Sequence, residues 1–251
     1  MLTLLGKTIL ITGAARGIGA ATARLCHEAG AKVILHASGN TDSAKKAAAS
    51  IGQIADDFLF EDLSKPHTGF SVVARALERT DRLDAVVNNA GMFTASPLAG
   101  DQSAWDDGWA HTLAVNVQAP ADICRAAIAH FREQGKGGMI VNVASRAGHR
   151  GDGVENAAYA ASKGAVLAMT KTWARGLAAE NILLYAIAPG WVETRMAPQD
   201  IEAREKALEE IPLGRVAQPE EVGAMIAFLL TGASPSATGA TFDINGASYV
   251  R

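Results

Sequence analysis

The amino-acid sequence predicts an α/β protein built on a parallel sheet with helices on both faces. Short apolar runs alternate with helical patterns along the whole chain, which is the order that repeated βαβ units produce. The runs are continuously apolar rather than alternating with polar residues, as expected of strands buried on both faces. No internal repeat, low-complexity tract or linker divides the 251 residues. We therefore predict a single domain over residues 1–251.

The first strands and helix are predicted near the amino terminus. Thr8–Thr12 is a short β-branched run followed by a turn rich in Gly and Ala, and apolar residues then recur at helical spacing up to Gly30. Ala31–Ser38 is a second strand, and a separation of about 30 residues suits a βαβ crossover. The remaining elements are predicted in this order: helix 41–50, strand within 56–64 ending near Asp62, helix 69–80, strand within 83–91, helices within 105–132, strand within 137–145, a long helix from residue 156, strand within 181–190, helices 201–210 and 219–230, and strand 240–244.

Composition and charge exclude several classes of protein. The net charge of −3 leaves no basic field for nucleic acid or an anionic membrane, and no apolar run approaches the roughly 20 residues of a membrane span. Lys7 interrupts the apolar start of the chain, which we interpret as a buried strand and not as a secretion signal. Two cysteines, Cys26 and Cys124, are too few for a disulfide framework, and the six histidines lack metal-ligand spacing. We predict a cytoplasmic protein without a metal site.

The glycine-rich turn after the first strand is a candidate dinucleotide site. Its sequence, TGAARGIG, spans Thr12–Gly19 and opens the first helix. Glycines let a backbone approach a pyrophosphate closely, and the helix N-terminus supplies free N–H groups and a positive dipole end. The spacing of Gly13, Gly17 and Gly19 differs from the usual GxGxxG pattern, and a plain structural turn is the alternative. The position between a strand and a helix in a βαβ unit favours a cofactor.

The end of the second strand bears on which cofactor binds. Sites that prefer NAD usually carry an acid there, about 20 residues after the glycines, for the ribose 2′-hydroxyl. Here the strand ends in Ala37 and Ser38 without an acid. Arg16 is placed to meet a 2′-phosphate with a charge-assisted hydrogen bond. We therefore predict NADP in preference to NAD, with a solvated surface role for Arg16 as the alternative.

Tyr159 and Lys163 lie four residues apart in the stretch NAAYAASKGA, with no acid between them. Residues at this spacing share one helix face, so both side chains can reach one cleft. An ammonium at about 4 Å would lower the phenol pKa from about 10 by up to about three units, toward neutrality. Such a phenol exchanges protons efficiently. Taken alone, the pair is better explained by packing and a solvated charge, so its meaning depends on the rest of the chain.

Four motifs occur in order along the chain: TGAARGIG, NNAG at Asn88–Gly91, YAASK at Tyr159–Lys163 and PGWVET at Pro189–Thr194. With them the chain resembles the short-chain dehydrogenase/reductase family over essentially its whole length, and its pattern looks most like that of the 3-oxoacyl-carrier-protein reductases. The resemblance implies a Rossmann fold with seven parallel strands, usually in a homotetramer. It also implies an oxidoreductase that transfers hydride between a nicotinamide cofactor and a ketone or secondary alcohol. The alternative function is a catalytically silent dinucleotide-binding regulatory or scaffold protein of the same fold.

The resemblance also implies roles for the residues that match the family's motifs. Tyr159 is then the acid or base, and Lys163 lowers its pKa and holds the nicotinamide ribose. Ser145 donates a hydrogen bond to the substrate oxygen, and Asn116 fixes a water that passes protons to Lys163. A helix cap at Ser145 and a buried, satisfied amide at Asn116 are the structural alternatives. The implied cofactor-binding residues are Gly13, Arg16, Gly17, Ile18, Gly19, Ala37, Ser38, Asp62, Leu63, Asn89, Ala90, Gly91, Tyr159, Lys163, Pro189, Gly190, Val192 and Thr194.

The substrate pocket is expected between the residues after the fifth strand and a lid within about 194–216. Its candidate lining residues, Ser145, His149, Tyr159 and Trp191, mix polar and apolar groups, which suits a small polar ketone or hydroxy compound. Solvent-facing positions for the polar residues are the alternative. The chain departs from the family pattern in three places, and one of them is VAS at Val143–Ser145, where a double serine is common. Ser145 and Tyr159 are 14 residues apart, slightly more than is usual, and DINGAS replaces a common double glycine in a region that often packs between subunits.

Overall fold

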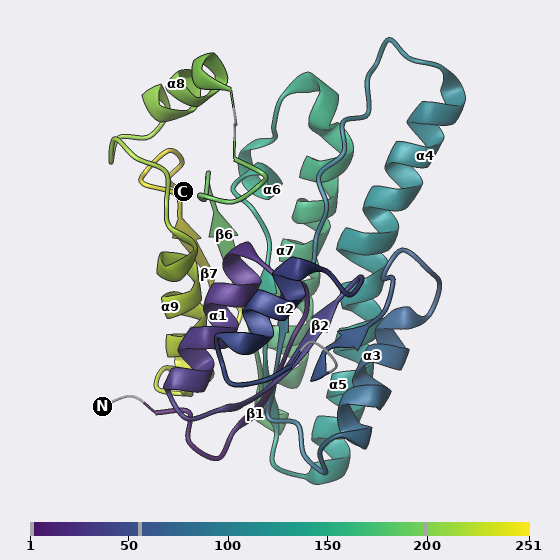
Figure 1. The fold of residues 1–251 in the computed structure, drawn as a ribbon, viewed down its shortest axis with the longest axis vertical. Coiled ribbons are helices and arrows are strands. Elements are labelled where there is room, and N and C mark those ends of the chain that lie inside the picture. The colour runs from purple at the N-terminus through teal and green to yellow at the C-terminus, as the bar shows by residue number, and fades with distance from the viewer. Residues whose placement is uncertain (1–2, 55–56, 198–199) are drawn as a thin grey trace.

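The structure, a computed structural model, describes residues 3–54, 57–197 and 200–251. The described residues form one sheet of seven strands in the order β3-β2-β1-β4-β5-β6-β7 (Figure 1), and all neighbouring strands pair in parallel. The strands are β1 Thr8–Ile11, β2 Lys32–Ala37, β3 Leu59–Phe60, β4 Ala85–Asn88, β5 Gly138–Val143, β6 Ile182–Pro189 and β7 Thr241–Ile244. The predicted α/β architecture with a single parallel sheet is confirmed.

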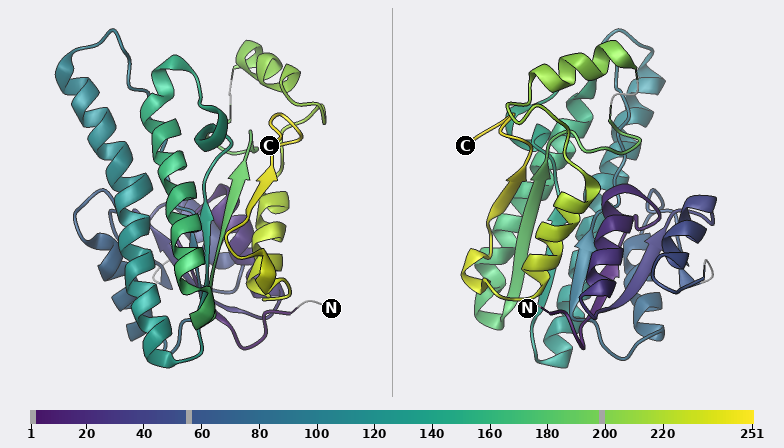
Figure 2. Two further views of the ribbon diagram at one scale, coloured as in Figure 1. Left: turned by 180° about the vertical axis from the view of Figure 1, so that it is seen from behind. Right: turned by 60° about the vertical axis from the view of Figure 1, so that its left-hand side comes forward.

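Helices cover both faces of the sheet. In Figure 1, α1, α2 and α9 lie over one face, and the left view of Figure 2 shows α5 and α7 over the other. Within the described ranges, no helix is long and apolar enough to cross a membrane. The helices are α1 Gly17–Glu28, α2 Asp42–Ala49, α3 Thr68–Glu78, α4 Gln102–Leu113, α5 Ala119–Gln134, α6 Ala147–Arg150, α7 Ala157–Leu177, α8 Ile201–Glu209 and α9 Pro219–Leu230, with short helical turns η2 Ala114–Gln118, η3 Val154–Asn156, η4 Ala178–Glu180 and η5 Pro235–Ala237.

The strands feed two apolar cores, one on each face of the sheet. On β1, Ile9 and Ile11 belong to the core beneath α1 and α9, whereas Leu10 belongs to the core beneath α3 and α5. All three side chains are fully buried. Because successive side chains of a strand point to opposite faces, a strand covered on both sides is apolar at every position. Burying one such side chain is worth roughly 1.5–3 kcal/mol, which explains the continuous apolar runs of the sequence.

The third strand is shorter than the sequence predicted. Strand β3 is only Leu59–Phe60 and pairs with the end of β2 at the edge of the sheet. The chain turns away at Asp62, whose carboxylate accepts hydrogen bonds from the backbone N–H and the hydroxyl of Ser64 at 3.0 and 2.7 Å. Local side-chain bonds of this kind compete with strand pairing. Asp56, at the start of the predicted segment, lies outside the described residues.

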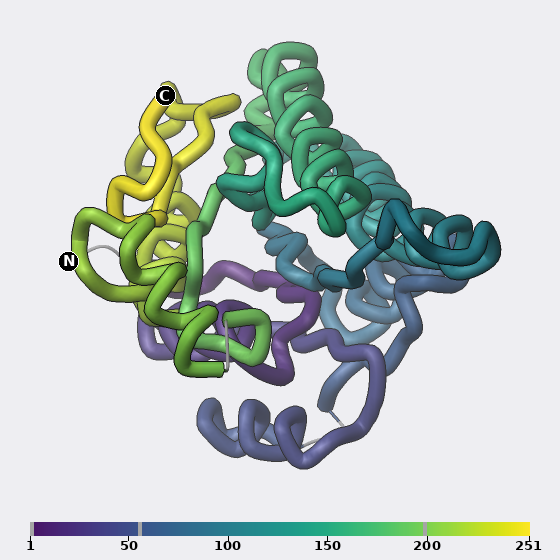
Figure 3. Tube along the Cα trace, turned by 90° about the horizontal axis from the view of Figure 1, so that it is seen from above, coloured from purple at the N-terminus to yellow at the C-terminus, as the bar shows by residue number. Residues whose placement is uncertain are grey.

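The sheet positions a binding site where the strand order reverses. Strand β1 pairs with β2 on one side and with β4 on the other, so the connections diverge there and leave a crevice at the carboxyl ends of the strands. Seen from above, the turn after β1 lies beside the segment that follows β6 (Figure 3). An added Cβ at Gly17 would lie 3.0 Å from Cγ2 of Thr194. The fold therefore brings the first and last of the four motifs into contact.

Candidate active site

A cavity of about 1000 Å³ opens at the carboxyl ends of the strands. Of the predicted site residues, Gly19, Asn116 and His149 are not among the described residues that line it. The predicted residues that do line it are Gly13, Arg16, Gly17, Ile18, Ala37, Ser38, Asp62, Leu63, Asn89, Ala90, Gly91, Ser145, Tyr159, Lys163, Pro189, Gly190, Trp191, Val192 and Thr194. The structure thus gathers residues that are far apart in sequence around one hollow.

The glycine turn requires glycine for two different reasons. Gly13 and Gly17 have φ values of +63° and +53°, a left-handed conformation that side chains with a Cβ rarely adopt. An added Cβ at Gly19 would lie 2.3 Å from the carbonyl oxygen of Gly13. Gly19 therefore lets α1 pack under the turn, and the structure does not place it on the cavity surface where the sequence analysis expected a cofactor contact.

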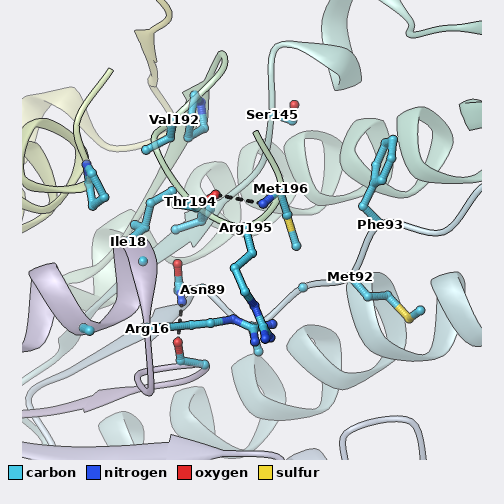
Figure 4. A pocket seen from close by; sticks show the side chains of 18 of the residues that line it. Arg16, Ile18, Asn89, Met92, Phe93, Ser145, Val192, Thr194, Arg195 and Met196 are labelled. Carbon is cyan, nitrogen blue, oxygen red and sulfur yellow. Dashed lines mark hydrogen bonds between the residues drawn. The ribbon is translucent and has the colours of Figure 1, made fainter. Parts of the chain in front are cut away.

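Asn89 fixes the shape of this turn. Its Nδ2 donates to the carbonyl oxygens of Thr12 and Gly13 at 2.9 and 3.1 Å, as Figure 4 shows in part. The hydroxyl of Thr12 accepts in return from the backbone N–H groups of Asn89 and Ala90 at 3.1 and 3.0 Å. The turn after β1 and the loop after β4 are thus joined by four hydrogen bonds, so the two motifs form one rigid unit.

The start of α1 has the character of an anion site. Its N-cap residue, Arg16, makes no side-chain capping bond, and no acidic residue occupies the first turn. The first N–H groups of a helix have no partner within the helix, and the dipole favours negative charge there. In Figure 4 the side chains of Arg16 and Arg195 reach toward the same place, and both line the cavity. Two cations above a helix N-terminus fit the phosphates of a dinucleotide.

His36 is a buried residue of this region that the sequence analysis did not single out. Its Nδ1 accepts from the backbone N–H of Gly13 at 3.4 Å, and its Nε2 lies 3.1 Å from the carbonyl oxygen of Glu61. Burial lowers the pKa of His36 to about 4. The ring is therefore neutral near pH 7, with its proton on Nε2, and it ties the glycine turn to the loop after β3. A lone histidine within a strand gave no signal of this role in the sequence.

The predicted catalytic pair lies on α7 and points into the cavity. Lys163 is almost fully buried, and its Nζ donates to the carbonyl oxygen of Val143 at 2.9 Å. Nζ lies 5.8 Å from the centroid of the Tyr159 ring. Burial lowers the pKa of Lys163 to about 8. The hydroxyl of Ser145 lines the cavity and accepts from the backbone N–H of Ala147 at 3.1 Å. Ser145 is not the helix cap of the structural alternative, because Arg146 is the N-cap of α6 and that helix has no side-chain cap.

The expected lowering of the Tyr159 pKa toward neutrality is not found. Burial raises the pKa of Tyr159 above its ordinary value of 10.0, a hydrogen bond with the Ser145 side chain lowers it, and the charge of Asp152 raises it. Burial outweighs the other effects because removing a phenolate from water is costly. The sequence estimate assumed a cation at about 4 Å, whereas the Lys163 ammonium is directed to the backbone of β5. The phenol is therefore protonated at neutral pH.

Asn116 lies in the π-helical turn η2 beneath the cavity. Its Oδ1 accepts from the backbone N–H of Met92 at 2.9 Å, and its Nδ2 donates to the carbonyl oxygen of Met92 and the hydroxyl of Ser162 at 2.9 and 3.0 Å. A Cβ at Gly91 would lie 3.4 Å from this Oδ1 and 3.3 Å from Nζ of Lys163. Isolated π-turns often mark functional sites. Asn116 is thus a buried, satisfied amide that also sets the loop next to Lys163.

The substrate end of the cavity is only partly as predicted. Trp191 lines it, and Phe93 contacts Tyr159 edge to face with ring centroids 5.0 Å apart. His149 instead stacks on Tyr249, with centroids 5.7 Å apart and an interplanar angle of 15°. The closeness of His149 to Ser145 in the sequence predicted a position in the pocket, but the α6 turn directs its ring to the carboxyl-terminal segment.

The predicted lid contains α8, which stands over the carboxyl ends of the strands (Figure 1). Arg204 of α8 donates to Glu193 at 3.1 Å, and Glu210 at the end of α8 accepts from Arg146 and Arg150 at 3.1 and 3.0 Å. Pro198–Gln199, within the predicted lid, lie outside the described residues. The described part of the lid is therefore connected by ion pairs to both walls of the cavity.

The parallel sheet carries a glycine turn, an anion site at the first helix, a half-buried tyrosine and a buried lysine. Together these features define a dinucleotide-binding oxidoreductase. Comparison with known proteins agrees. The family model described as enoyl-(acyl carrier protein) reductase matches residues 13–247. The chain belongs to this family, the short-chain dehydrogenases/reductases.

Two curated relatives and one solved structure illustrate the similarity. The chain is 38% identical over 245 residues to a 3-oxoacyl-(acyl-carrier-protein) reductase of Thermotoga maritima, covering 96% of this chain and 97% of the relative. It is 30% identical over 256 residues to an L-rhamnose 1-dehydrogenase (NAD(P)(+)) of Azotobacter vinelandii, covering 98% of both. A short-chain type dehydrogenase/reductase from Mycobacterium marinum superposes with a TM-score of 0.89 at 28% identity, covering 100% of this chain and 98% of the other.

The family and the site together establish the type of reaction. The protein is an oxidoreductase that transfers a hydride between a nicotinamide cofactor, NAD(P), and a ketone or secondary alcohol. The sequence prediction of family and reaction type is thereby confirmed. The alternative of a catalytically silent protein finds no support in the comparisons.

Proposed function

We propose that the protein reduces a small polar ketone with NADPH and that Tyr159 donates the proton. The observation that carries this proposal is the Tyr159 phenol, which lines the cavity together with Ser145 and Lys163 and whose pKa desolvation raises above its ordinary value of 10.0. Such a phenol is protonated at neutral pH and is therefore a general acid rather than a base. Oxidation of an alcohol requires the phenolate, so the free enzyme near neutral pH is in the protonated form that serves reduction.

The neighbouring residues complete the proton-transfer site. We assign to Ser145, which lies beside the phenol, the second hydrogen bond to the substrate oxygen, because two donors stabilise the negative charge that develops there. Lys163 holds the nicotinamide ribose, and its ammonium is oriented by Val143. Asn116 keeps the loop at Gly91 and Met92 in place. We assign the route by which protons reach Lys163 to this wall of the cavity. When bound, the nicotinamide cofactor supplies the hydride.

A preference for NADP over NAD is part of this proposal. The cavity wall at the end of β2 consists of Ala37, Ser38 and Gly39, and the cations of Arg16 and Lys46 also line the cavity. A carboxylate at the end of β2 would repel a 2′-phosphate, whereas hydroxyl and cationic groups bind one. The cofactor-binding residues of the sequence analysis are retained, with Gly19 acting through packing and with Arg195 added at the phosphates.

Three further parts of the proposal concern the surroundings of the site. The segment 194–216 acts as a lid that closes over cofactor and substrate. Family resemblance favours a homotetramer, which light scattering tests directly. A cytoplasmic location is favoured by Cys26 and Cys124, which are both free and buried in the described structure.

Replacing Tyr159 with Phe tests the proposal. Turnover of every ketone and alcohol in a screen with both cofactors is expected to fall by about 10²–10⁴-fold or more, because one acid/base group supplies that much. NADPH binding, measured by fluorescence titration, is expected to persist. Unchanged turnover in Tyr159→Phe, or a wild-type protein that binds NADPH but reduces no ketone, would contradict the proposed function.

A further inference from the structure

Arg146, the residue that follows Ser145, is a buried cation at the wall of the cavity. It is 5% exposed, and burial lowers its pKa. A charged group is rarely buried unless it is paired or used, because its removal from water costs several kcal/mol. Arg146 lines the cavity together with Ser145 and Trp191. A guanidinium thus lies beside the place where we position the substrate carbonyl.

The partners of Arg146 leave part of its hydrogen-bonding capacity open. Its Nη2 donates to Oε2 of Glu210 at 3.1 Å, and its guanidinium carbon lies 5.9 Å above the Trp191 ring. Arg150 Nη2 donates to the same Oε2 at 3.0 Å. Nη1 of Arg146 is buried and has no hydrogen-bond partner among the described residues. A buried charged donor without a partner is unfavourable by at least about 1–3 kcal/mol.

The cluster pairs two positively charged side chains with one carboxylate. The two guanidinium groups of Arg146 and Arg150 share a single carboxylate oxygen. Asp152 also lines the cavity and favours the charged form of Arg146 at a distance, but its carboxylate accepts from the N–H of Gly153 at 2.7 Å. Glu210 marks the position of a carboxylate that contacts both arginines. Nη1 of Arg146 still has no hydrogen-bond partner among the described residues.

Glu210 is well placed to be exchanged for another acid. Its side chain is 49% exposed, in contrast to 7% for Arg146, so it returns to water readily when it leaves the arginines. The α8 segment does not depend on Glu210 alone. It is also joined to Glu193 through Arg204, and Ile211 at its end is buried.

We propose that Arg146 and Arg150 form a carboxylate subsite next to Ser145, and that Glu210 occupies it until the acid group of the substrate displaces it. This inference rests on the proposed function and narrows it, since the substrate is then a short oxo acid or the corresponding hydroxy acid. Glu210 acts as an internal competitor. Because Glu210 lies at the end of α8, binding of the substrate's acid and the position of the lid are coupled.

The test compares an oxo acid with its uncharged ester. 3-Oxobutanoate and its methyl ester carry the same ketone, and their reduction is followed by loss of NADPH absorbance. We expect the wild type to favour the acid, and Arg146→Gln to lower kcat/KM for the acid by about 10- to 100-fold with little change for the ester, because a hydrogen bond to a charged group is lost. Arg146→Lys is expected to restore part of the preference, as a single charge without the fork.

Glu210→Gln tests whether Glu210 competes with the substrate or only holds α8 in place. If Glu210 is a competitor, its removal lowers KM for the acid severalfold and leaves KM for the ester unchanged. If it only holds α8, its removal raises KM for both compounds. Arg132→Gln serves as a matched control, because Arg132 forms a two-pronged pair with Glu180 at 2.6 and 2.7 Å and is not among the described lining residues.

Three outcomes overturn the inference. They are an equal or greater preference of the wild type for the ester, an equal effect of Arg146→Gln on both compounds, and a raised KM for both compounds in Glu210→Gln. Each leaves the proposed ketone reduction intact, since the ester is still turned over. If the wild type reduces neither these two compounds nor any ketone of the screen, the proposed function itself fails.

Discussion

The two ends of the cavity are built from different parts of the chain. At the cofactor end, the half-buried Asn89 and the buried His36 bind the backbone of the glycine turn, and Gly19 packs beneath it. At the substrate end, charged side chains of the α6 and α8 segments meet, as in the pair of Arg146 and Glu210. Backbone geometry follows from the fold, whereas wall side chains can change one at a time. One scaffold can thus keep its cofactor and change its substrate.

The largest expected effect concerns the cofactor end of the cavity. Gly19→Ala places a Cβ 2.3 Å from the carbonyl oxygen of Gly13, and backbone atoms cannot yield as a flexible side chain does. Overpacking of this kind typically destabilises by about 1–3 kcal/mol or more. We expect a loss of that size in the free energy of unfolding in urea, together with loss of NADPH binding.

Gly176→Ala is the matched control for this substitution. Gly176 lies within α7 and nothing lies within 4 Å of an added Cβ. Alanine is a better helix former than glycine by about 1 kcal/mol, so this variant is expected to gain stability. If Gly19→Ala is as stable as Gly176→Ala, the turn is not rigid and the contrast between the two ends is lost.

His36 makes the stability of the cofactor end depend on pH. Its folded pKa of about 4 lies below the ordinary value of 6.5, so the unfolded chain binds the proton first as the pH falls. The stability contributed by neutral His36 is fully present above pH 6.5 and is lost toward pH 4, by about 3 kcal/mol in total. Urea unfolding at a series of pH values measures this loss.

His36→Asn is expected to flatten that dependence. The amide accepts from the N–H of Gly13 without gaining a proton, so stability between pH 6.5 and 4 changes less than in the wild type. His27→Asn, at an exposed position of α1, is the control and keeps the wild-type slope. If the unfolding free energy of both variants depends on pH to the same extent, groups other than His36 cause the acid sensitivity.

Ser38→Asp tests how the cofactor end selects NADP. A carboxylate at the end of β2 repels the 2′-phosphate and accepts from a ribose 2′-hydroxyl. We expect the ratio of NADPH to NADH in kcat/KM to fall by about 10- to 100-fold, as for one charge-assisted contact. Arg16 and Lys46 remain in this variant, so an unchanged ratio would mean that they and not the strand end decide the preference.

The smallest effect is expected at the substrate end. Arg204→Gln removes the pair with Glu193, whose partners are 39% and 38% exposed, and exposed pairs contribute at most about 1 kcal/mol. We expect a change in unfolding free energy within that limit, unchanged NADPH affinity, and a raised KM for the ketone because α8 is held less firmly. Weaker NADPH binding would show that α8 also supports the cofactor end.

Sequence patterns predicted the cofactor end of the cavity better than the substrate end. The glycine turn and the spacing of Tyr159 and Lys163 are local, and local spacing survives folding unchanged. The contact of Arg146 with Glu210 joins residues 64 positions apart, which no local pattern reveals. His149 was misplaced because its stacking partner, Tyr249, lies in the distant carboxyl-terminal segment.

The direction of the Tyr159 pKa shift was also beyond the sequence. The i, i+4 spacing showed that a cation is near, but the Val143 carbonyl that takes up the Lys163 ammonium and the burial of the phenol are properties of the folded chain. When burial and a neighbouring charge oppose each other, only their actual geometry decides which prevails.

The central claim, that Tyr159 is a protonated donor near neutral pH, is tested most directly by titrating its phenol. Tyrosinate absorbance is recorded against pH for the wild type and for Tyr159→Phe, and the difference isolates Tyr159 from Tyr185 and Tyr249. We expect the midpoint of the Tyr159-dependent absorbance to lie above pH 10.0, the ordinary phenol value. Absorbance that appears near neutral pH would contradict it and would show that the lysine charge, not burial, controls the phenol.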